Sequence, residues 1–290
     1  MANVAIATDS NSGILPAEGE ALGVAVVPMP VHIDGKVYHE GIDLTHGQFY
    51  EMLLNDAEVS TSQPTPDEVI SVWEKCLRDH REVVYIPMSA GLSGSYQTAA
   101  MLAQGYDGRV FVVDNRRISV TQRLSVMDAL ALADEGHTGE EIKRILEEQA
   151  LDACIYLAAD TLKYLRRGGR VTGAEAVVGS ALGIRPVMEI YGEKLTCVSK
   201  VRGMKSARDT IIQRVKADIN GRLKHLWDAG KLRIGVAYSQ VPENVLADWK
   251  AEVLSAIPGA VDIVAEPLSL SIACHTGPGA LGAGAVRIYH

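Results

Sequence analysis

The chain of 290 residues is 47% hydrophobic and 22% charged, which is ordinary for a soluble globular protein and long enough for two domains. Its net charge of -8 argues against a nucleic-acid partner, because binding to the phosphate backbone depends on clustered positive charge. No stretch approaches the roughly 18 continuous apolar residues of a membrane span. The four cysteines are scattered without a C-x-x-C pair, and the first residues lack the pattern of a signal peptide. We therefore expect a cytoplasmic protein.

In the first half of the chain, short apolar runs alternate with helical stretches. Near-continuous apolar runs at residues 4–8, 83–88 and 110–114 predict strands of a parallel sheet that is covered on both faces. Residues 31–41 differ, because apolar and polar residues alternate there around Asp34-Gly35, the strongest short-range signal for a hairpin.

The second half has a different pattern. Residues 185–203 predict two antiparallel strands around the turn at Gly192-Glu193-Lys194, and a long polar helix is expected over 204–230. The predicted fold class is therefore α/β with two domains. Residues 1–153 are expected to form a parallel, Rossmann-like α/β domain, and residues 154–290 a mixed α+β domain with antiparallel strands.

The stretch PMSAGLSGSYQTAA at 87–100 places Ser93 where a predicted strand meets a predicted helix. Ligands bind at that edge of open parallel sheets, and the first turn of a helix favours anions. Gly94 would let an anion approach the backbone closely. An N-cap role for Ser93 explains the same serine without any ligand.

A nucleophilic role for Ser93 is the main alternative. The stretch is close to the hydrolase motif G-x-S-x-G, although Ser95 stands in place of its last glycine. The chain order of Ser93, an acid such as Asp160 or Asp262, and then His275 is also that of α/β-hydrolases.

A second polar turn precedes the helix that is predicted from residue 66. Thr65 as N-cap, Pro66 at the first helical position and Glu68 two residues later predict a capping box. The hydroxyl and amide groups of Thr61, Ser62 and Gln63, just upstream, are not explained by this cap. A solvated loop is the default interpretation for them.

Two further groups are candidates for binding an anion. Arg170 follows a Gly-Gly pair at the expected end of a helix, where a cation is structurally normal but can also grip a carboxylate or phosphate. It could equally serve a regulator that binds a phosphosugar or a nucleotide. A glycine-rich loop is expected to carry His275. We discount its G-x-G-x-x-G as a dinucleotide site, because Pro278 lies inside it and only eight residues follow Gly282.

Motifs of several enzyme and metal-binding classes are missing from the sequence. It contains no Walker A loop, no kinase glycine-rich loop with a following lysine and no H-E-x-x-H, and its histidines lack metal-ligand spacing. Asp9 ends the first predicted strand, where it could bind a cation or simply form a turn.

Six motifs in order resemble those of the DegV family of bacterial fatty-acid-binding proteins, from about residue 4 to about residue 284. They are TDS near the N-terminus, STSQPTP, SAGLSGSYQTA, TLKYLRRGGRVTG, LGIRPVMEI followed by a glycine, and HTGPGALG. The resemblance implies a two-domain α/β protein that buries one long-chain fatty acid in a tunnel between the domains.

The resemblance also implies a role for each candidate residue. Ser93, through its hydroxyl, and Gly94, through its backbone N–H, are implied to cradle the carboxylate, with Thr61 and Ser62 in the same polar cluster. Arg170 and His275 are implied to lie at the tunnel mouth, where the carboxyl group is modified.

The implied protein is not itself an enzyme and needs no cofactor. A separate kinase subunit, similar to dihydroxyacetone kinase, is implied to phosphorylate the bound acid. The binding protein then carries the acyl phosphate to phospholipid synthesis, and a transient contact with a membrane surface is compatible with this role.

Overall fold

The computed structural model divides into two compact units. Unit 1 comprises Met1–Ala150, Ser269–Ser271 and Tyr289, and unit 2 comprises Leu151–Leu268, Ile272–Ile288 and His290. The structure describes residues 3–168, 171–172, 183–192, 195–260 and 262–289.

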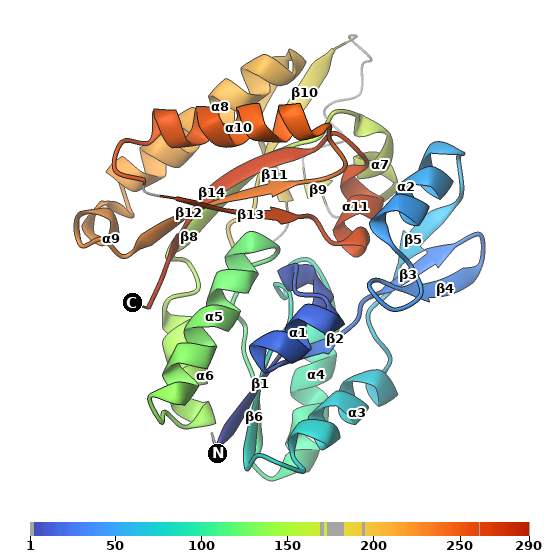
Figure 1. The fold of residues 1–290 in the computed structure, drawn as a ribbon, viewed down its shortest axis with the longest axis vertical. Helices are drawn as coiled ribbons and strands as arrows, with labels where there is room; N and C mark the ends of the chain where they lie inside the picture. The colour runs from blue at the N-terminus through green and yellow to red at the C-terminus, as the bar shows by residue number, and fades with distance from the viewer. Residues whose placement is uncertain (1–2, 169–170, 173–182, 193–194, 261, 290) are drawn as a thin grey trace. The chain divides into compact units, whose positions relative to one another are not determined.

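Unit 1 contains a parallel sheet of four strands (Figure 1). Its order is β2 (Val24–Val27), β1 (Val4–Asp9), β6 (Glu82–Ile86) and β7 (Val110–Val112), and every neighbouring pair is parallel. All six residues of β1 are buried, as expected of a central strand whose two faces are both covered.

Helices cover both faces of this sheet, and the side chains of β1 alternate between them. Val4 and Ile6 pack in a core with α1 (Pro16–Leu22), α5 (Val120–Asp134) and α6 (Gly139–Glu148). Ala5 and Ala7 pack in the opposite core with α3 (Pro66–Cys76) and α4 (Ser95–Ala103). This arrangement confirms the predicted parallel α/β fold.

A small antiparallel sheet also belongs to unit 1. Its strands are β4 (Lys36–His39), β3 (Pro30–Ile33) and β5 (Val59–Thr61), and α2 (His46–Leu54) connects β4 to β5 along the chain. Asp34 and Gly35 both have positive φ angles, 48° and 79°. Two such residues form the type I′ turn of a two-residue hairpin, so the predicted hairpin is confirmed.

Unit 2 is built on a mixed sheet of seven strands. Their order is β13 (Ile263–Pro267), β12 (Leu232–Tyr238), β14 (Leu281–Arg287), β8 (Ala153–Ala158), β10 (Ile184–Glu189), β11 (Leu195–Arg202) and β9 (Val171–Thr172). The pairs at the two edges are parallel, whereas the pairs between them are antiparallel. The predicted antiparallel pairing of the two strands within residues 185–203 is confirmed.

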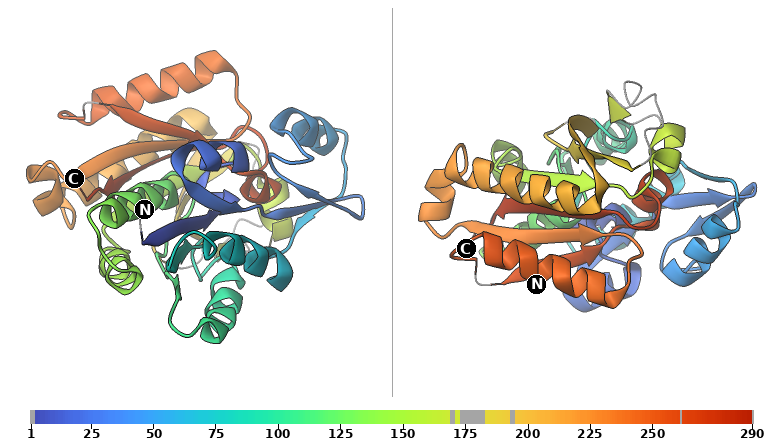
Figure 2. Two further views of the ribbon diagram at one scale, coloured as in Figure 1. Left: turned by 60° about the horizontal axis from the view of Figure 1, so that its bottom comes forward. Right: turned by 90° about the horizontal axis from the view of Figure 1, so that it is seen from above.

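Two helices of unit 2, α8 (Gly203–Asn220) and α10 (Glu243–Ala256), lie side by side over the sheet (Figures 1 and 2). The shorter helices are α7 (Leu162–Gly168), α9 (Lys224–Asp228) and α11 (Leu270–Thr276). The last of these begins within the segment that is assigned to unit 1.

The prediction of one long polar helix over 204–230 is wrong in one respect, because the helix is broken at Gly221. Gly221 ends α8, and the chain turns so that Leu223 N donates to Asp218 O at 2.9 Å before α9 begins. A Cβ at Gly221 would lie 2.9 Å from Ala217 O, so the break requires a glycine.

Candidate functional site

Polar residues of unit 1 gather at the carboxyl edge of the parallel sheet, where β1 and β6 are neighbours. The chain goes from β1 outward to β2, and from β6 outward to β7 on the other side, so the strand order reverses between β1 and β6. In open parallel sheets, ligands bind in the crevice that such a reversal creates. The loops at 10–13 and 87–94 border this position.

Asp9, the last residue of β1, ties the two loops together. Its Oδ2 accepts a hydrogen bond from Met88 N at 2.8 Å, and its Oδ1 accepts from Asn11 N at 3.0 Å and from Gln122 Nε2 at 3.1 Å. Burial raises the pKa of Asp9 from 3.8 to about 6, although these hydrogen bonds act in the opposite direction. Because donors surround both oxygens, Asp9 is a structural tie and needs no cation.

Asn11 extends this buried network to a distant part of the chain. Its Oδ1 accepts hydrogen bonds from Ser271 Oγ at 2.6 Å and from Ser269 Oγ at 2.8 Å. Its Nδ2 donates to Met88 Sδ at 3.0 Å. The segment Ser269–Ser271 thus belongs to unit 1 through specific contacts.

Ser93 lies just before α4, whose N-cap is Gly94. The Ser93 Oγ accepts a hydrogen bond from Ser95 N at 3.1 Å and lies 2.7 Å from Ser95 Oγ. Ser93 is therefore not the N-cap residue, but it does satisfy one N–H group of the first turn. Among the described residues, the backbone N–H groups of Gly94, Tyr96 and Gln97 have no intramolecular acceptor. Three donors of one helix N-terminus therefore remain for water or an anion.

The loop after β5 meets this helix. Thr61 ends β5 opposite Val31, and the hydroxyl of the following Ser62 lies 2.9 Å from His32 Nε2. Gln63, next in the chain, accepts a hydrogen bond at its Oε1 from Thr98 Oγ1 of α4 at 3.2 Å.

The structure therefore joins two of the predicted groups within unit 1. The loop with Thr61 and Ser62 is linked to the helix that starts after Ser93 and Gly94. That these four residues bind a ligand stays a prediction.

The two other predicted site residues belong to the second half of the chain. Arg170 lies outside the described residues. His275 is half-buried in the last turn of α11, so the prediction that a glycine-rich loop carries it is wrong, and that loop begins only after the helix. Gly277 and Gly279 form that turn with φ angles of 69° and 80°, and Gly282 is already in β14. A helix thus leads into a strand, which is the reverse of a dinucleotide-binding turn.

The described contacts of the candidate hydrolase residues do not assemble a catalytic triad. Asp160 Oδ1 accepts from Arg185 Nη2 at 2.8 Å, and both oxygens of Asp262 lie 2.7 Å from Arg233 Nη1. The Ser93 hydroxyl is engaged with Ser95. Each candidate acid holds a guanidinium group, so nothing in these contacts activates a nucleophile.

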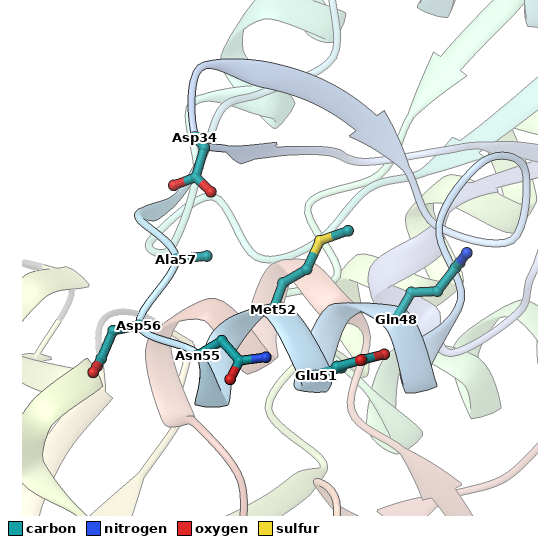
Figure 3. Close-up of a pocket in the computed structure, with 7 residues that line it drawn as sticks. All are labelled: Asp34, Gln48, Glu51, Met52, Asn55, Asp56 and Ala57. Carbon is teal, nitrogen blue, oxygen red and sulfur yellow. The ribbon is translucent and has the colours of Figure 1, made fainter.

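A groove of about 490 Å³ lies between α2 and the β3–β4 hairpin of unit 1 (Figure 3). Carboxylates of Asp34, Glu51 and Asp56 line it, and Met52 is in the middle of the lining (Figure 3). The groove contains none of the predicted site residues, and its charged walls do not suit an acyl chain.

Among the residues that the structure describes, no three or more His, Cys, Asp or Glu side chains are placed so that they could hold a metal ion. No described helix combines the length and the apolar character that crossing a bilayer requires.

Sequence reasoning missed part of the network behind the site. Gln122 and the pair Ser269 and Ser271 carry no local motif, because their partners lie more than 100 residues away in the sequence. The run TDSNS at the end of the first predicted strand was the available signal. A carboxylate and an amide at the carboxyl end of a central strand belong to the edge where parallel sheets bind ligands.

Comparisons with known proteins give one consistent result for the sequence. The model of the DegV family, described as "Uncharacterised protein, DegV family", matches residues 3–287. A DegV domain-containing protein of Deinococcus radiodurans is 31% identical over 279 residues, which cover 92% of this chain and 99% of that protein. One of Staphylococcus aureus is 30% identical over 277 residues and 96% of each chain.

Solved structures agree with the sequence comparisons. A DegV family protein from Thermus thermophilus, described by its fatty acid binding, has a TM-score of 0.86 at 30% identity and covers 99% of this chain and 100% of its own. DegV of Bacillus subtilis, described as a fatty acid binding protein, has a TM-score of 0.83 at 27% identity and covers 98% of this chain and 99% of its own. These similarities confirm the predicted fold class.

Proposed function

The chain belongs to the DegV family, and we therefore propose that it binds a long-chain fatty acid. In this proposal the Ser93 hydroxyl and the Gly94 backbone N–H hold the carboxylate, together with Thr61 and Ser62. The acyl chain occupies a buried apolar tunnel. The support from relatives is that similar structures from Thermus thermophilus and Bacillus subtilis are described as fatty-acid-binding.

One observation in this chain carries the proposal. Hydroxyl groups and three backbone N–H donors without an intramolecular acceptor occur together at the N-terminus of α4, beside the position where the strand order reverses. A buried carboxylate needs such donors, because burying a charge without hydrogen-bond partners is very costly. A helix N-terminus supplies both N–H groups and a favourable dipole.

The second half of the chain is proposed to act on the same carboxyl group. Arg170 and His275 are assigned to the end of the ligand where the carboxyl group reacts. A guanidinium group donates two parallel hydrogen bonds. It therefore suits both the carboxylate of the free acid and the phosphate group of the acyl phosphate.

We assign no catalysis to the chain itself. A separate kinase, similar to dihydroxyacetone kinase, is proposed to transfer a phosphoryl group from ATP to a carboxylate oxygen of the bound acid. The resulting acyl phosphate serves phospholipid synthesis. The absence of a Walker A or kinase glycine-rich loop from the sequence fits this division of labour.

Extraction of the purified protein tests fatty-acid binding directly. We expect mass spectrometry of an organic-solvent extract to identify a long-chain fatty acid in about equimolar amount. Titration of delipidated protein with palmitate should then show saturable binding. The proposal fails if the extract contains no fatty acid and added palmitate does not bind.

Arg170→Ala tests the assignment of Arg170 to the reactive end. We expect this variant to retain most of its palmitate affinity but to be a poor substrate for the kinase, measured as acyl phosphate formed per bound acid. Arg233→Ala, which removes an arginine already paired with Asp262, is the matched control and should behave like the unmodified chain in both assays. Equal losses of binding and phosphorylation in Arg170→Ala would contradict the assignment.

A further inference from the structure

The side chain of Gln63 connects the two polar segments of the site, which are the loop after β5 and the start of α4. Its Oε1 accepts a hydrogen bond from Thr98 Oγ1 at 3.2 Å, which links the loop after β5 to the first turns of α4. The same oxygen lies 3.1 Å from the point that a Cβ on Gly94 would occupy. The carboxamide therefore packs against the backbone of the residue that is proposed to hold the carboxylate.

The neighbours of Gln63 are anchored on both sides. Ser62 is hydrogen-bonded to His32 of β3 at 2.9 Å, and Pro64 is buried. Thr65 then caps α3 in a capping box with Glu68. Because the backbone on either side is held, the Gln63 side chain is directed at α4 by a defined stretch of loop.

This contact gives a structural reason for the glycine at position 94. The φ and ψ angles of Gly94 are -70° and -2°, a conformation that any residue adopts. The backbone therefore does not require glycine there. The missing side chain instead leaves the Gln63 oxygen where it is, since a Cβ would lie 3.1 Å from it and the exposed carboxamide would have to move by a few tenths of an ångström.

We propose that Gln63 is a positioning residue, which holds the Thr61–Ser62 loop against the Ser93–Gly94 turn through its hydrogen bond to Thr98. The inference rests on the proposed binding of a fatty-acid carboxylate to these residues. Without the link, the hydroxyl groups of one segment and the N–H groups of the other no longer converge on one carboxylate, and part of their combined effect on affinity is lost.

A double-mutant cycle tests the link between Gln63 and Thr98. We expect Gln63→Ala and Thr98→Val each to lower the affinity for palmitate roughly fivefold, the effect of one neutral hydrogen bond. The double variant should lose no more affinity than either single variant, because both remove the same bond. Gln104→Ala, an exposed glutamine at the other end of α4, is the matched control and should bind like the unmodified chain.

Gly94→Ala provides a second cycle. In the unmodified background the added methyl group should push Gln63 aside and lower palmitate affinity. In the Gln63→Ala background no other described residue, apart from the two chain neighbours of Gly94, lies within 4 Å of that methyl group, so the same substitution should have a smaller effect.

Gln63→Glu separates a role at the ligand from a purely structural one. A glutamate oxygen can still accept from Thr98, so we expect the melting temperature to be preserved. Its negative charge should nevertheless weaken palmitate binding more than Gln63→Ala does, while binding of the neutral analogue hexadecanol should change little.

Independent, additive losses in Gln63→Ala and Thr98→Val would overturn the inference. Equal effects of Gln63→Glu on palmitate and hexadecanol would also overturn it. Failure of the unmodified chain to bind palmitate at all would instead refute the proposed function, so the two failures are distinguishable.

Discussion

At the level of single residues, Asp9 and Ser93 show two different uses of a polar side chain at one edge of the sheet. Asp9 is fully buried, and three donors from the protein contact its two oxygens, so its carboxylate is engaged within the fold. Ser93 is only half-buried, and its hydroxyl lies 2.7 Å from that of Ser95, a pair in which either oxygen can be the donor. Asp9 therefore holds the loops in place, whereas binding of a ligand by Ser93 stays a prediction.

Ser93→Ala should weaken fatty-acid binding without unfolding the protein. The substitution removes one charge-assisted hydrogen bond, which corresponds to about 1.5–3 kcal/mol of binding free energy. We expect the dissociation constant for palmitate, measured by calorimetry, to rise accordingly. Ser60→Ala, at an exposed position of β5, is the control that should leave it unchanged. Unchanged palmitate affinity in Ser93→Ala would mean that Ser93 only caps α4.

Asp9→Asn should change how stability depends on pH. The folded protein holds the Asp9 proton more tightly than the unfolded chain, because its pKa is raised from 3.8 to about 6. The folded state therefore gains stability as pH falls from about 6 to about 4, and loses it as pH rises through the same window. This increase in the pKa corresponds to at most about 3 kcal/mol of unfolding free energy.

Urea unfolding at a series of pH values between 4 and 7 measures this effect. As pH falls from about 6 to about 4, the unfolding free energy of the unmodified chain should rise relative to that of Asp9→Asn. Asp67→Asn, an exposed aspartate at the start of α3, is the control whose profile should run parallel to that of the unmodified chain. A parallel profile for Asp9→Asn would show that the buried carboxyl group does not titrate in this window.

At the level of helices and strands, α4 begins differently from several other helices of unit 1. Capping boxes close the N-termini of α2, α3 and α6 through Thr45, Thr65 and Thr138. The N-cap of α4 is Gly94, which has no side chain to accept a hydrogen bond. The first turn of α4 is thus less completely capped by its own residues, which suits an external anion.

Two threonine caps allow a matched comparison of stability and binding. Thr65→Ala and Thr138→Ala remove the same kind of capping box, so each should lower the free energy of unfolding by about 1 kcal/mol. Thr65→Ala should also lower palmitate affinity, because Thr65 anchors the loop that contains Thr61 and Ser62. Thr138→Ala should lower stability alone. Equal palmitate affinities of the two variants would show that this anchoring is irrelevant to the ligand.

At the level of the whole chain, two units with separate hydrophobic cores make up the protein. Unit 1 has a core on each face of its parallel sheet, and unit 2 has one core between its mixed sheet and α8 and α10. Each core joins elements that are distant in the sequence, so each unit has the means to fold cooperatively.

Hydrogen exchange measured by mass spectrometry should locate the ligand without any substitution. We expect palmitate to slow amide exchange in peptides that cover residues 60–65 and 89–98 of unit 1, because these carry the proposed carboxylate donors. Because His275 is also assigned to the carboxyl end of the ligand, palmitate should slow amide exchange in residues 272–280 as well. The peptide that covers α6 serves as the internal control. Protection that spares residues 89–98 would place the carboxylate elsewhere.

Much of the fold could be derived from the sequence alone, because the responsible signals are local. Apolar runs predicted the strands, Asp34-Gly35 predicted the hairpin, and Thr65 with Glu68 predicted a capping box. The break at Gly221 was missed because the polar helical pattern continues across it, whereas the close approach to Ala217 O is visible only in the folded chain. The order of six motifs likewise identified the family from the sequence.

Only the tertiary structure showed which polar side chains are tied into the fold by hydrogen bonds to distant segments. From the sequence, Asp9 could bind a cation or form a turn, Ser93 could cap a helix, attack a substrate or hold a carboxylate, and Gln63 had no explanation. Three-dimensional contacts showed that Asp9 is saturated by donors from three segments and that Gln63 reaches α4 beside Gly94. The physical reason is that burial and hydrogen-bond saturation depend on partners tens of residues away, which no local pattern encodes.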